Sequence, residues 1–223
     1  MQLCTIIIID GVLRYTKDVK YFETKVQPFI RAFIISDALL YSSLNLINIL
    51  FVVYVTSSVP GGTVTSATIA IALGLVARIV VELSVGRRAS RLSERQQLLL
   101  IIGGMTAISV SYVGFAYSQN IAVLSVLWML NGAGWAIGHP TKLALVAKYI
   151  NHDQASQEWG VTDALNMTLV IIVMLAGAYI VGQFSFGLLF MLAAAINTLG
   201  LCPYVFYLRS IKPITYEPGQ STA

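Results

Sequence analysis

Polar side chains recur on one helical face in each of two otherwise apolar stretches of the chain. The first face, with spacings of four, four and three residues, comprises Asp37, Tyr41, Asn45 and Asn48. The second, with spacings of three, four and four, comprises Trp128, Asn131, Trp135 and His139. Such groups bind a polar solute when they line a cavity, and they join helices when they bond to one another. Both interpretations are open. Under the cavity interpretation the predicted substrate-binding residues are Asp37, Tyr41, Asn45, Asn48, Asn131, Trp135 and His139.

Charged residues also fall inside the apolar stretches. Arg78 and Glu82 are one helical turn apart, which allows an ion pair. Asp37 and Asp163 add two carboxylates, and a desolvated carboxylate without a cation tends to hold a proton. We therefore expect ion pairing or proton coupling at Arg78, Glu82 and Asp163. The alternatives to proton coupling are a static ion pair of Arg78 with Glu82, and a position for Asp163 near the start of a helix, where its charge stabilises the helix dipole.

The motifs of common enzymes and metal sites are missing from the sequence. Its two histidines and two cysteines are too dispersed to form a ligand set. The near-repeat Ser36-Asp37-Ala38-Leu39 and Thr162-Asp163-Ala164-Leu165 suggests an intramembrane aspartyl enzyme as a third hypothesis. However, the chain has no Gly-x-Ser-x-Gly, no His-Glu-x-x-His and no nucleotide-binding loop. We expect no enzyme activity, no cofactor and no metal.

Six mainly apolar stretches carry these residues. Each is long enough to cross a bilayer as a helix, which takes about 20 residues. The stretches are 29–56, 63–85, 97–117, 121–142, 159–181 and 184–208. The chain is 57% hydrophobic and only 11% charged, so a water-soluble globule is excluded.

The positive charges predict the orientation of these stretches. Of the 14 Lys and Arg residues, 13 fall in four segments, which are 14–31, 87–95, 142–148 and 209–212. The connectors that alternate with them, 57–62, 118–120 and 182–185, hold no charged residue. Positively charged loops stay on the cytoplasmic side, so we predict an all-α multi-pass protein of the cell membrane with both termini cytoplasmic. Because the net charge of +4 follows bilayer geometry, we expect the lipid bilayer and no nucleic acid as a partner.

Composition divides the chain into three parts. We predict a cytoplasmic amino-terminal arm over 1–28, a transmembrane bundle over 29–208, and a disordered cytoplasmic tail over 209–223. Tight turns at 60–62 and 182–183 predict that neighbouring helices pack side by side as antiparallel hairpins. The small-residue motif Gly134-x-x-x-Gly138 predicts a close contact with another helix.

The segment between the second and third stretches, Gly86-Arg-Arg-Ala-Ser-Arg-Leu-Ser-Glu-Arg95, resembles a motif of the major facilitator superfamily. That motif reads Gly-x-x-x-Asp-Arg-x-Gly-Arg-Arg/Lys and lies in the same place. Gly86, Arg91 and Arg95 match it, while Ser90 and Ser93 replace its Asp and its second Gly, and Glu94 replaces an Arg. The run 175–190 also resembles the end of the family's fifth helix and the start of its sixth.

The resemblance covers residues 29–208, which is one six-helix half of a twelve-helix transporter. It implies two inverted three-helix repeats, with the first and fourth helices lining a cavity. Those two helices carry the polar faces found from spacing. It further implies transport of a small solute by alternating access, with protons as a second transported species. The functional unit would be a parallel homodimer or a complex with a partner half-transporter. The alternative is a non-transporting six-helix scaffold or partner subunit.

Overall fold

The computed structural model describes residues 28–89, 91–149 and 155–210. Within these residues the chain forms six long helices, and the predicted all-α class is confirmed. The helices are α2 (Pro28–Ser58), α3 (Val64–Ala89), α4 (Glu94–Tyr117), α5 (Ile121–Val146), α6 (Ala155–Gln183) and α7 (Phe186–Ser210). All six are long and apolar enough to cross a membrane, as predicted. Nearly all of the predicted arm and tail lies outside the described residues.

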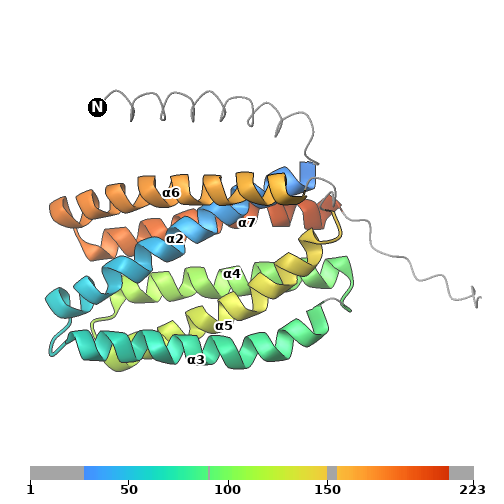
Figure 1. The fold of residues 1–223 in the computed structure, drawn as a ribbon. Helices are drawn as coiled ribbons and strands as arrows, with labels where there is room; N and C mark the ends of the chain where they lie inside the picture. Colours follow the sequence, from blue (N-terminus) through green and yellow to red (C-terminus); the bar gives the residue numbers. More distant parts are fainter. Residues whose placement is uncertain (1–27, 90, 150–154, 211–223) are drawn as a thin grey trace, which may run out of the picture.

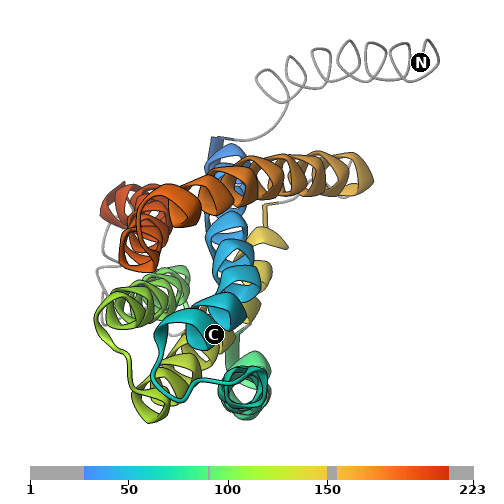
Figure 2. The same cartoon turned by 90° about the vertical axis from the view of Figure 1, so that its left-hand side faces the viewer.

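The six helices run roughly parallel to one long axis (Figure 1). α5 packs against α3 and α4, α2 packs against α6 and α7, and α4 packs against α7. In the end-on view α4 and α7 lie together along one side of the bundle (Figure 2). The uncovered part of α3 and α6 is larger than that of the other four helices.

The predicted hairpin packing is wrong for two pairs of neighbouring helices. α2 and α3 touch little beyond their shared turn, and the same holds for α6 and α7. A short turn fixes only one end of a helix pair, and lipid provides no hydrophobic force to close the rest. Each helix instead lies along the partner that offers the closest backbone approach, so α3 contacts α5 and α6 contacts α2.

Glycines permit this close approach on both sides of α5. A Cβ atom at Gly74 of α3 would lie 2.7 Å from the carbonyl oxygen of Trp128. A Cβ atom at Gly134 would lie 2.6 Å from the carbonyl oxygen of Gly104 on α4, and one at Gly104 would lie 2.9 Å from the amide nitrogen of Gly138. All three distances are too short for a Cβ atom. The contact predicted from Gly134-x-x-x-Gly138 is therefore confirmed.

An aromatic cluster fills the interior at the end of the bundle near the turns 59–63 and 118–120. The ring of Phe51 lies 5.0 Å from that of Trp128 and 5.4 Å from that of Phe115. Phe190 continues the cluster, 5.7 Å from Phe115 and 4.9 Å from Tyr54. Four helices, α2, α4, α5 and α7, thus share one apolar core, and Trp128 belongs to that core rather than to a cavity.

Several helix boundaries differ from those predicted. α3 continues to Ala89 and α4 begins at Glu94, so Gly86 and Arg95 lie in helices and the connection is short. Ser93 caps α4, since its hydroxyl oxygen accepts a hydrogen bond from the backbone N–H of Gln96 at 3.4 Å. α5 also continues to Val146, with Pro140 inside the helix. Lys142 was predicted to end the stretch 121–142 and to begin a basic loop segment, and it lies instead inside the helix, one turn before its end.

Candidate functional site

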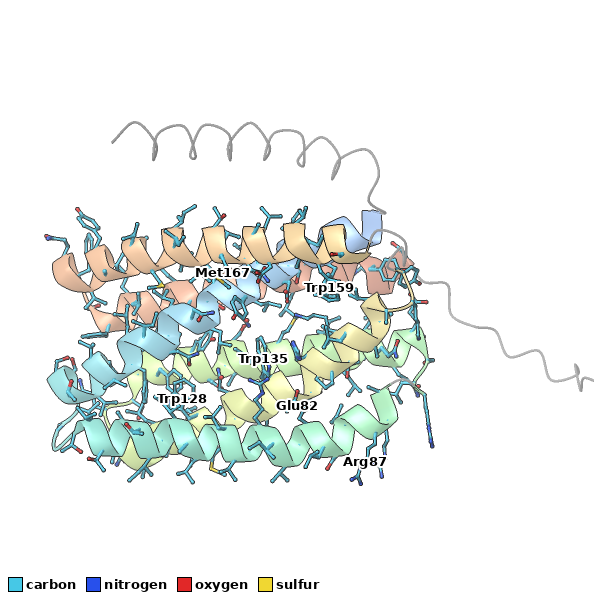
Figure 3. The ribbon with its side chains drawn as sticks, in the orientation of Figure 1. Glu82, Arg87, Trp128, Trp135, Trp159 and Met167 are labelled. Carbon is cyan, nitrogen blue, oxygen red and sulfur yellow. The ribbon has the colours of Figure 1, made fainter. Side chains whose placement is uncertain are left out.

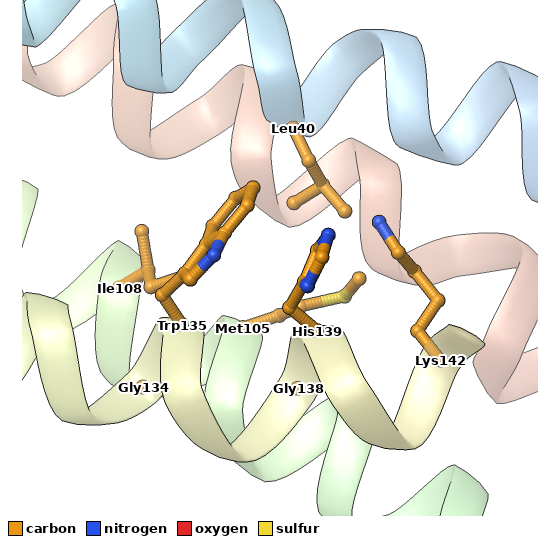
Figure 4. Close-up of a pocket in the computed structure, with 8 residues that line it drawn as sticks. All are labelled: Leu40, Met105, Ile108, Gly134, Trp135, Gly138, His139 and Lys142. Atoms are coloured by element: carbon orange, nitrogen blue, oxygen red, sulfur yellow. The ribbon is translucent and has the colours of Figure 1, made fainter. Parts of the chain in front are cut away.

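Three side chains of α5 lie on one helical face and point toward α2. Trp135, His139 and Lys142 rise side by side from α5 toward Leu40 of α2 (Figure 4). They line a small pocket together with Leu40, Met105, Ile108, Gly134 and Gly138. The centre of a water molecule can move within about 10 Å³ of this pocket, so the pocket has room for roughly one water molecule. A larger solute requires the neighbouring open face or a movement of the helices.

Lys142 forms a buried ion pair with Asp37. Its Nζ donates to Asp37 Oδ1, and Asn166 Nδ2 of α6 donates to Asp37 Oδ2 at 3.1 Å. The Lys142 side chain is 4% exposed and that of Asp37 is 14% exposed. The Lys142 ammonium also lies 5.3 Å from the ring centre of Phe33. Three helices, α2, α5 and α6, therefore meet at one compensated pair of charges.

Removal of either partner would leave an uncompensated buried charge, which is a large cost even where the intact pair contributes little net stability. The sequence analysis named Asp37 but missed Lys142 and Asn166. The available signal was the periodicity of α5, because Lys142 follows His139 by three residues and so extends the polar face by one turn. Assigning Lys142 to a loop by its charge concealed that signal.

A second ion pair lies on α3. Arg78 Nε is 3.1 Å from Glu82 Oε2, and their side chains are 34% and 35% exposed. The Arg78 guanidinium lies over the Trp135 ring, with its Cζ atom 5.3 Å from the ring centre. Figure 3 shows Trp135 and Glu82 near the middle of the bundle and Arg87 at the end of α3. The contact between Arg78 and Trp135 joins α3 to α5 at this point.

Trp135 connects the two charge pairs. Its ring stacks on that of His139, with ring centres 5.0 Å apart and an interplanar angle of 16°. The Lys142 ammonium lies 5.9 Å from the same indole ring. Among the described residues, the buried Trp135 Nε1 has no hydrogen-bond acceptor. A free N–H donor and two nearby cations make this a site that favours an electron-rich ligand.

The remaining predicted contacts are dispersed. Asn45 Nδ2 donates to the Tyr41 carbonyl oxygen at 2.8 Å, so Asn45 bonds within its own helix. Asn48 is exposed, whereas Asn131 is buried with no acceptor for its Nδ2 among the described residues. The structure thus brings Asp37, Trp135 and His139 close to one pocket, while Asn45 and Tyr41 bond along α2.

Asp163 is not part of either ion pair. It is exposed on α6, while the neighbouring Thr162 and Asn166 are buried. Among the described residues no cation pairs with it. Lys142 compensates Asp37, so the excess of carboxylates expected around Arg78 does not form there. Nor does the described part of the chain hold a group of three potential metal ligands.

A polar cluster lies at the end of the bundle where the motif segment is found. Gln97 donates from Nε2 to the Ala89 carbonyl oxygen at 2.7 Å and accepts from Lys148 Nζ at 2.9 Å. Glu94 accepts from the hydroxyls of Tyr149 and Tyr207, the latter at 3.0 Å. Burial, and then the bond with Glu94, raises the pKa of the Tyr149 phenol well above its usual range, so the hydroxyl stays a donor. Gly86, Arg91 and Arg95 are exposed around this cluster.

Comparison with known proteins gives one result for the family. The sequence model of the Major Facilitator Superfamily matches residues 33–222, a range that includes all six membrane spans. No curated protein matches the chain.

Proposed function

Because the chain belongs to the Major Facilitator Superfamily, whose members are typically transporters and not enzymes, we propose that it moves a small solute by alternating access. The functional unit is a parallel homodimer in the cell membrane, with both termini of each copy cytoplasmic. Each copy supplies one six-helix half of the transporter. The solute crosses between the two copies, and protons are a second species that the site moves.

One observation carries this proposal: the bundle leaves polar side chains uncovered within its spans. Asn48 and Asp163 are exposed, and the side chains of Arg78 and Glu82 are about one third exposed. A charged side chain at the centre of hydrocarbon costs about 2.5–3.5 kcal/mol, so such groups face water or protein. The spans of α4 and α7, away from their ends, expose apolar side chains such as Leu99, Val110 and Leu199 and no charged one. α3 and α6 expose apolar side chains too, such as Val76 and Leu175, so the charged groups are what distinguishes the two faces. The face with α2, α3 and α6 is thus suited to a wet cavity, and the face with α4 and α7 to lipid.

The packing pattern supports a pair of inverted repeats. If α2, α3 and α4 are exchanged with α5, α6 and α7, the contact of α3 with α5 becomes that of α6 with α2. The contact of α4 with α5 likewise becomes that of α7 with α2. Two repeats of this kind move as a rigid half when a transporter rocks around a fixed site. The buried pair of Asp37 with Lys142 joins the two repeats and favours this rigidity.

The predicted residues divide by their surroundings. Tyr41, Asn48, Trp135 and His139 remain candidate solute contacts, whereas Asp37 and Asn45 bond within the protein and Asn131 is buried. Arg78, Glu82 and Asp163 carry the charges at the interface between copies. The segment with Gly86, Arg91 and Arg95 contacts the partner on the cytoplasmic side, where the two copies separate and close in turn.

A second candidate is a six-helix scaffold or partner subunit that transports nothing. The observation that favours it is that both ion pairs are already satisfied within one copy. Such a protein would keep its polar face covered by a permanent partner. The two candidates differ in whether a solute exchanges across the membrane.

Crosslinking of single cysteines tests the arrangement. Cys4 and Cys202 are first replaced by serine, and one cysteine is then placed at the exposed Val76 of α3 or Leu175 of α6. The control position is the exposed Leu99 of α4, on the face assigned to lipid. We expect a dimer of the 24.2 kDa chain in nanodiscs, with crosslinks at the first two positions only. A strict monomer, or crosslinks at Leu99 alone, would exclude the homodimer.

Transport itself needs a separate measurement. Proteoliposomes that contain the purified chain are loaded with unlabelled solute, and entry of the labelled solute is followed by counterflow. Exchange by the crosslinkable dimer supports the transporter. A dimer that exchanges none of a broad solute panel supports the scaffold.

A further inference from the structure

We propose that the solute carries a carboxylate group and that the free edge of the Arg78 guanidinium binds it. The inference rests on the proposed function, since it names the class of solute for the same site.

Arg78 has donors that the protein does not use. A guanidinium offers five N–H groups in a planar fork. Its Nε donates to Glu82 Oε2 at 3.1 Å, and among the described residues no acceptor bonds to either Nη. Two adjacent Nη donors match the two oxygens of a carboxylate, which binds arginine through two parallel hydrogen bonds.

The guanidinium is held in place before any ligand arrives. Glu82 fixes one edge, and the Trp135 ring fixes the plane from 5.3 Å away. Trp135 is itself stacked on His139. Because arginine loses much rotational freedom when it binds, a side chain that is already fixed gives a ligand more of its binding free energy.

The other cation near Trp135 is not available to a ligand. Lys142 is 4% exposed and donates to Asp37, whereas the Arg78 side chain is 34% exposed. Arg78 therefore lies at the open face of the bundle with unused donors, and Lys142 lies inside it with a partner.

The local charges select the type of anion. Each cation here already has a carboxylate beside it, so the surroundings carry no excess positive charge for a dianion such as phosphate. A carboxylate adds a single negative charge, and its two oxygens can bond to the two free Nη groups in the guanidinium plane. One turn from Arg78, Leu75 is exposed on α3, which suits a solute with an apolar body next to the carboxylate.

The experiment uses three probes that share a phenyl ring: benzoate, its neutral amide benzamide, and the cation benzylamine. The full-length chain is placed in phosphatidylcholine nanodiscs, which carry no net charge, and binding of labelled benzoate is measured with each other probe as competitor. We expect benzoate to bind and benzamide and benzylamine not to compete. Inorganic phosphate serves as a third competitor and is expected to have no effect.

Variants locate the site. Arg78→Gln should weaken benzoate binding by about 10- to 100-fold, the usual effect of losing hydrogen bonds to a charged group. Arg78→Lys keeps the charge but lacks the fork, so a smaller loss is expected. The matched control is Arg87→Gln, which removes the same charge from the end of the same helix, away from Trp135 (Figure 3), and should bind as the wild type does.

Several results would overturn the proposal. These are equal competition by benzamide, displacement by phosphate, no binding of benzoate, or unchanged binding in Arg78→Gln. If Arg78→Gln does not fold, the competition series on the wild type and Arg78→Lys still decide. Benzoate binding without counterflow keeps the carboxylate site and contradicts transport. Counterflow of benzamide or benzylamine without benzoate binding keeps transport and contradicts the carboxylate site.

Discussion

The two ion pairs on either side of Trp135 consist of the same kinds of charge in opposite surroundings. Asp37 and Lys142 come from different helices, are almost fully buried and have a third partner in Asn166. Arg78 and Glu82 come from one helix, four residues apart, and are about one third exposed. In the first pair the acceptors and donors are used within the protein. In the second the guanidinium keeps donors that a ligand can reach.

This difference indicates which charges hold the fold and which serve the solute. A buried pair between helices depends on both members, since either one alone is a desolvated charge. A partly exposed pair within a helix costs little to break, because water screens the charge that remains. We therefore assign fold stability to the Asp37 pair and ligand binding to the Arg78 pair. The predictions below test this division, beginning with the largest expected effect.

Asp37→Leu should have the largest effect on stability. It leaves the Lys142 ammonium buried without its carboxylate, and loss of one partner from such a pair typically costs about 3–5 kcal/mol. Denaturant unfolding of the purified protein in detergent measures the change. The double variant Asp37→Leu/Lys142→Met should recover most of the loss. A single variant as stable as the wild type would show that the pair does not hold the fold.

Asn166→Leu should have the second largest effect on stability. It removes the amide donor of Asp37 Oδ2, and a hydrogen bond to a charged group contributes about 1.5–3 kcal/mol. The same unfolding measurement applies, with Asn48→Leu as control because Asn48 is exposed on α2. Equal effects of the two substitutions would contradict the special position of Asn166.

Tyr149→Phe extends the comparison to a tyrosine hydroxyl beyond the end of α5. Loss of the hydroxyl that donates to Glu94 should cost about 1 kcal/mol at neutral pH. The folded phenol has a raised pKa, so its contribution is complete below the unfolded pKa of about 10 and is lost as pH rises above that value. Unfolding of wild type and variant at several pH values should show a constant difference from about pH 7 to 9 and a smaller one above about 10. A difference that grows with pH would contradict this sign.

Arg78→Gln should have the smallest effect on stability and a large one on binding. Pairs four residues apart on a helix contribute about 0.3–0.5 kcal/mol, so the unfolding free energy should hardly change. Benzoate binding should weaken by about 10- to 100-fold in the same preparation. If the variant instead unfolds as easily as Asp37→Leu, the two pairs do not divide the roles as we propose.

Much of the fold followed from local features of the sequence. Six apolar runs and the spacing of polar residues gave the helices and the faces on which Asp37 and Trp135 lie. Gly134 gave a close contact, because a Cβ atom at that position would lie 2.6 Å from the Gly104 carbonyl oxygen. These features depend on residues within a few turns of one another, so a single sequence contains them.

The errors concern partners that are distant in the sequence. Charge alone placed Lys142 in a loop, but its place is set by Asp37 and Asn166, which belong to other helices. The short turns suggested paired neighbours, yet α3 packs on α5 through Gly74. Asp163 and Asn166 lie on one helix with similar polarity, and only the packing of α6 on α2 decides that Asn166 is buried and Asp163 exposed.

The pairing of Asp37 with Lys142 also sets an order for biosynthesis. The two residues are 105 positions apart in the chain. At roughly 5–20 residues per second, the ribosome makes the lysine about 5–20 s after the aspartate. During that interval α2 carries a carboxyl group with no cation to meet it, and it is a poorer membrane segment than it is in the finished protein. The stable residence of the first helix in the bilayer thus depends on the arrival of the fourth.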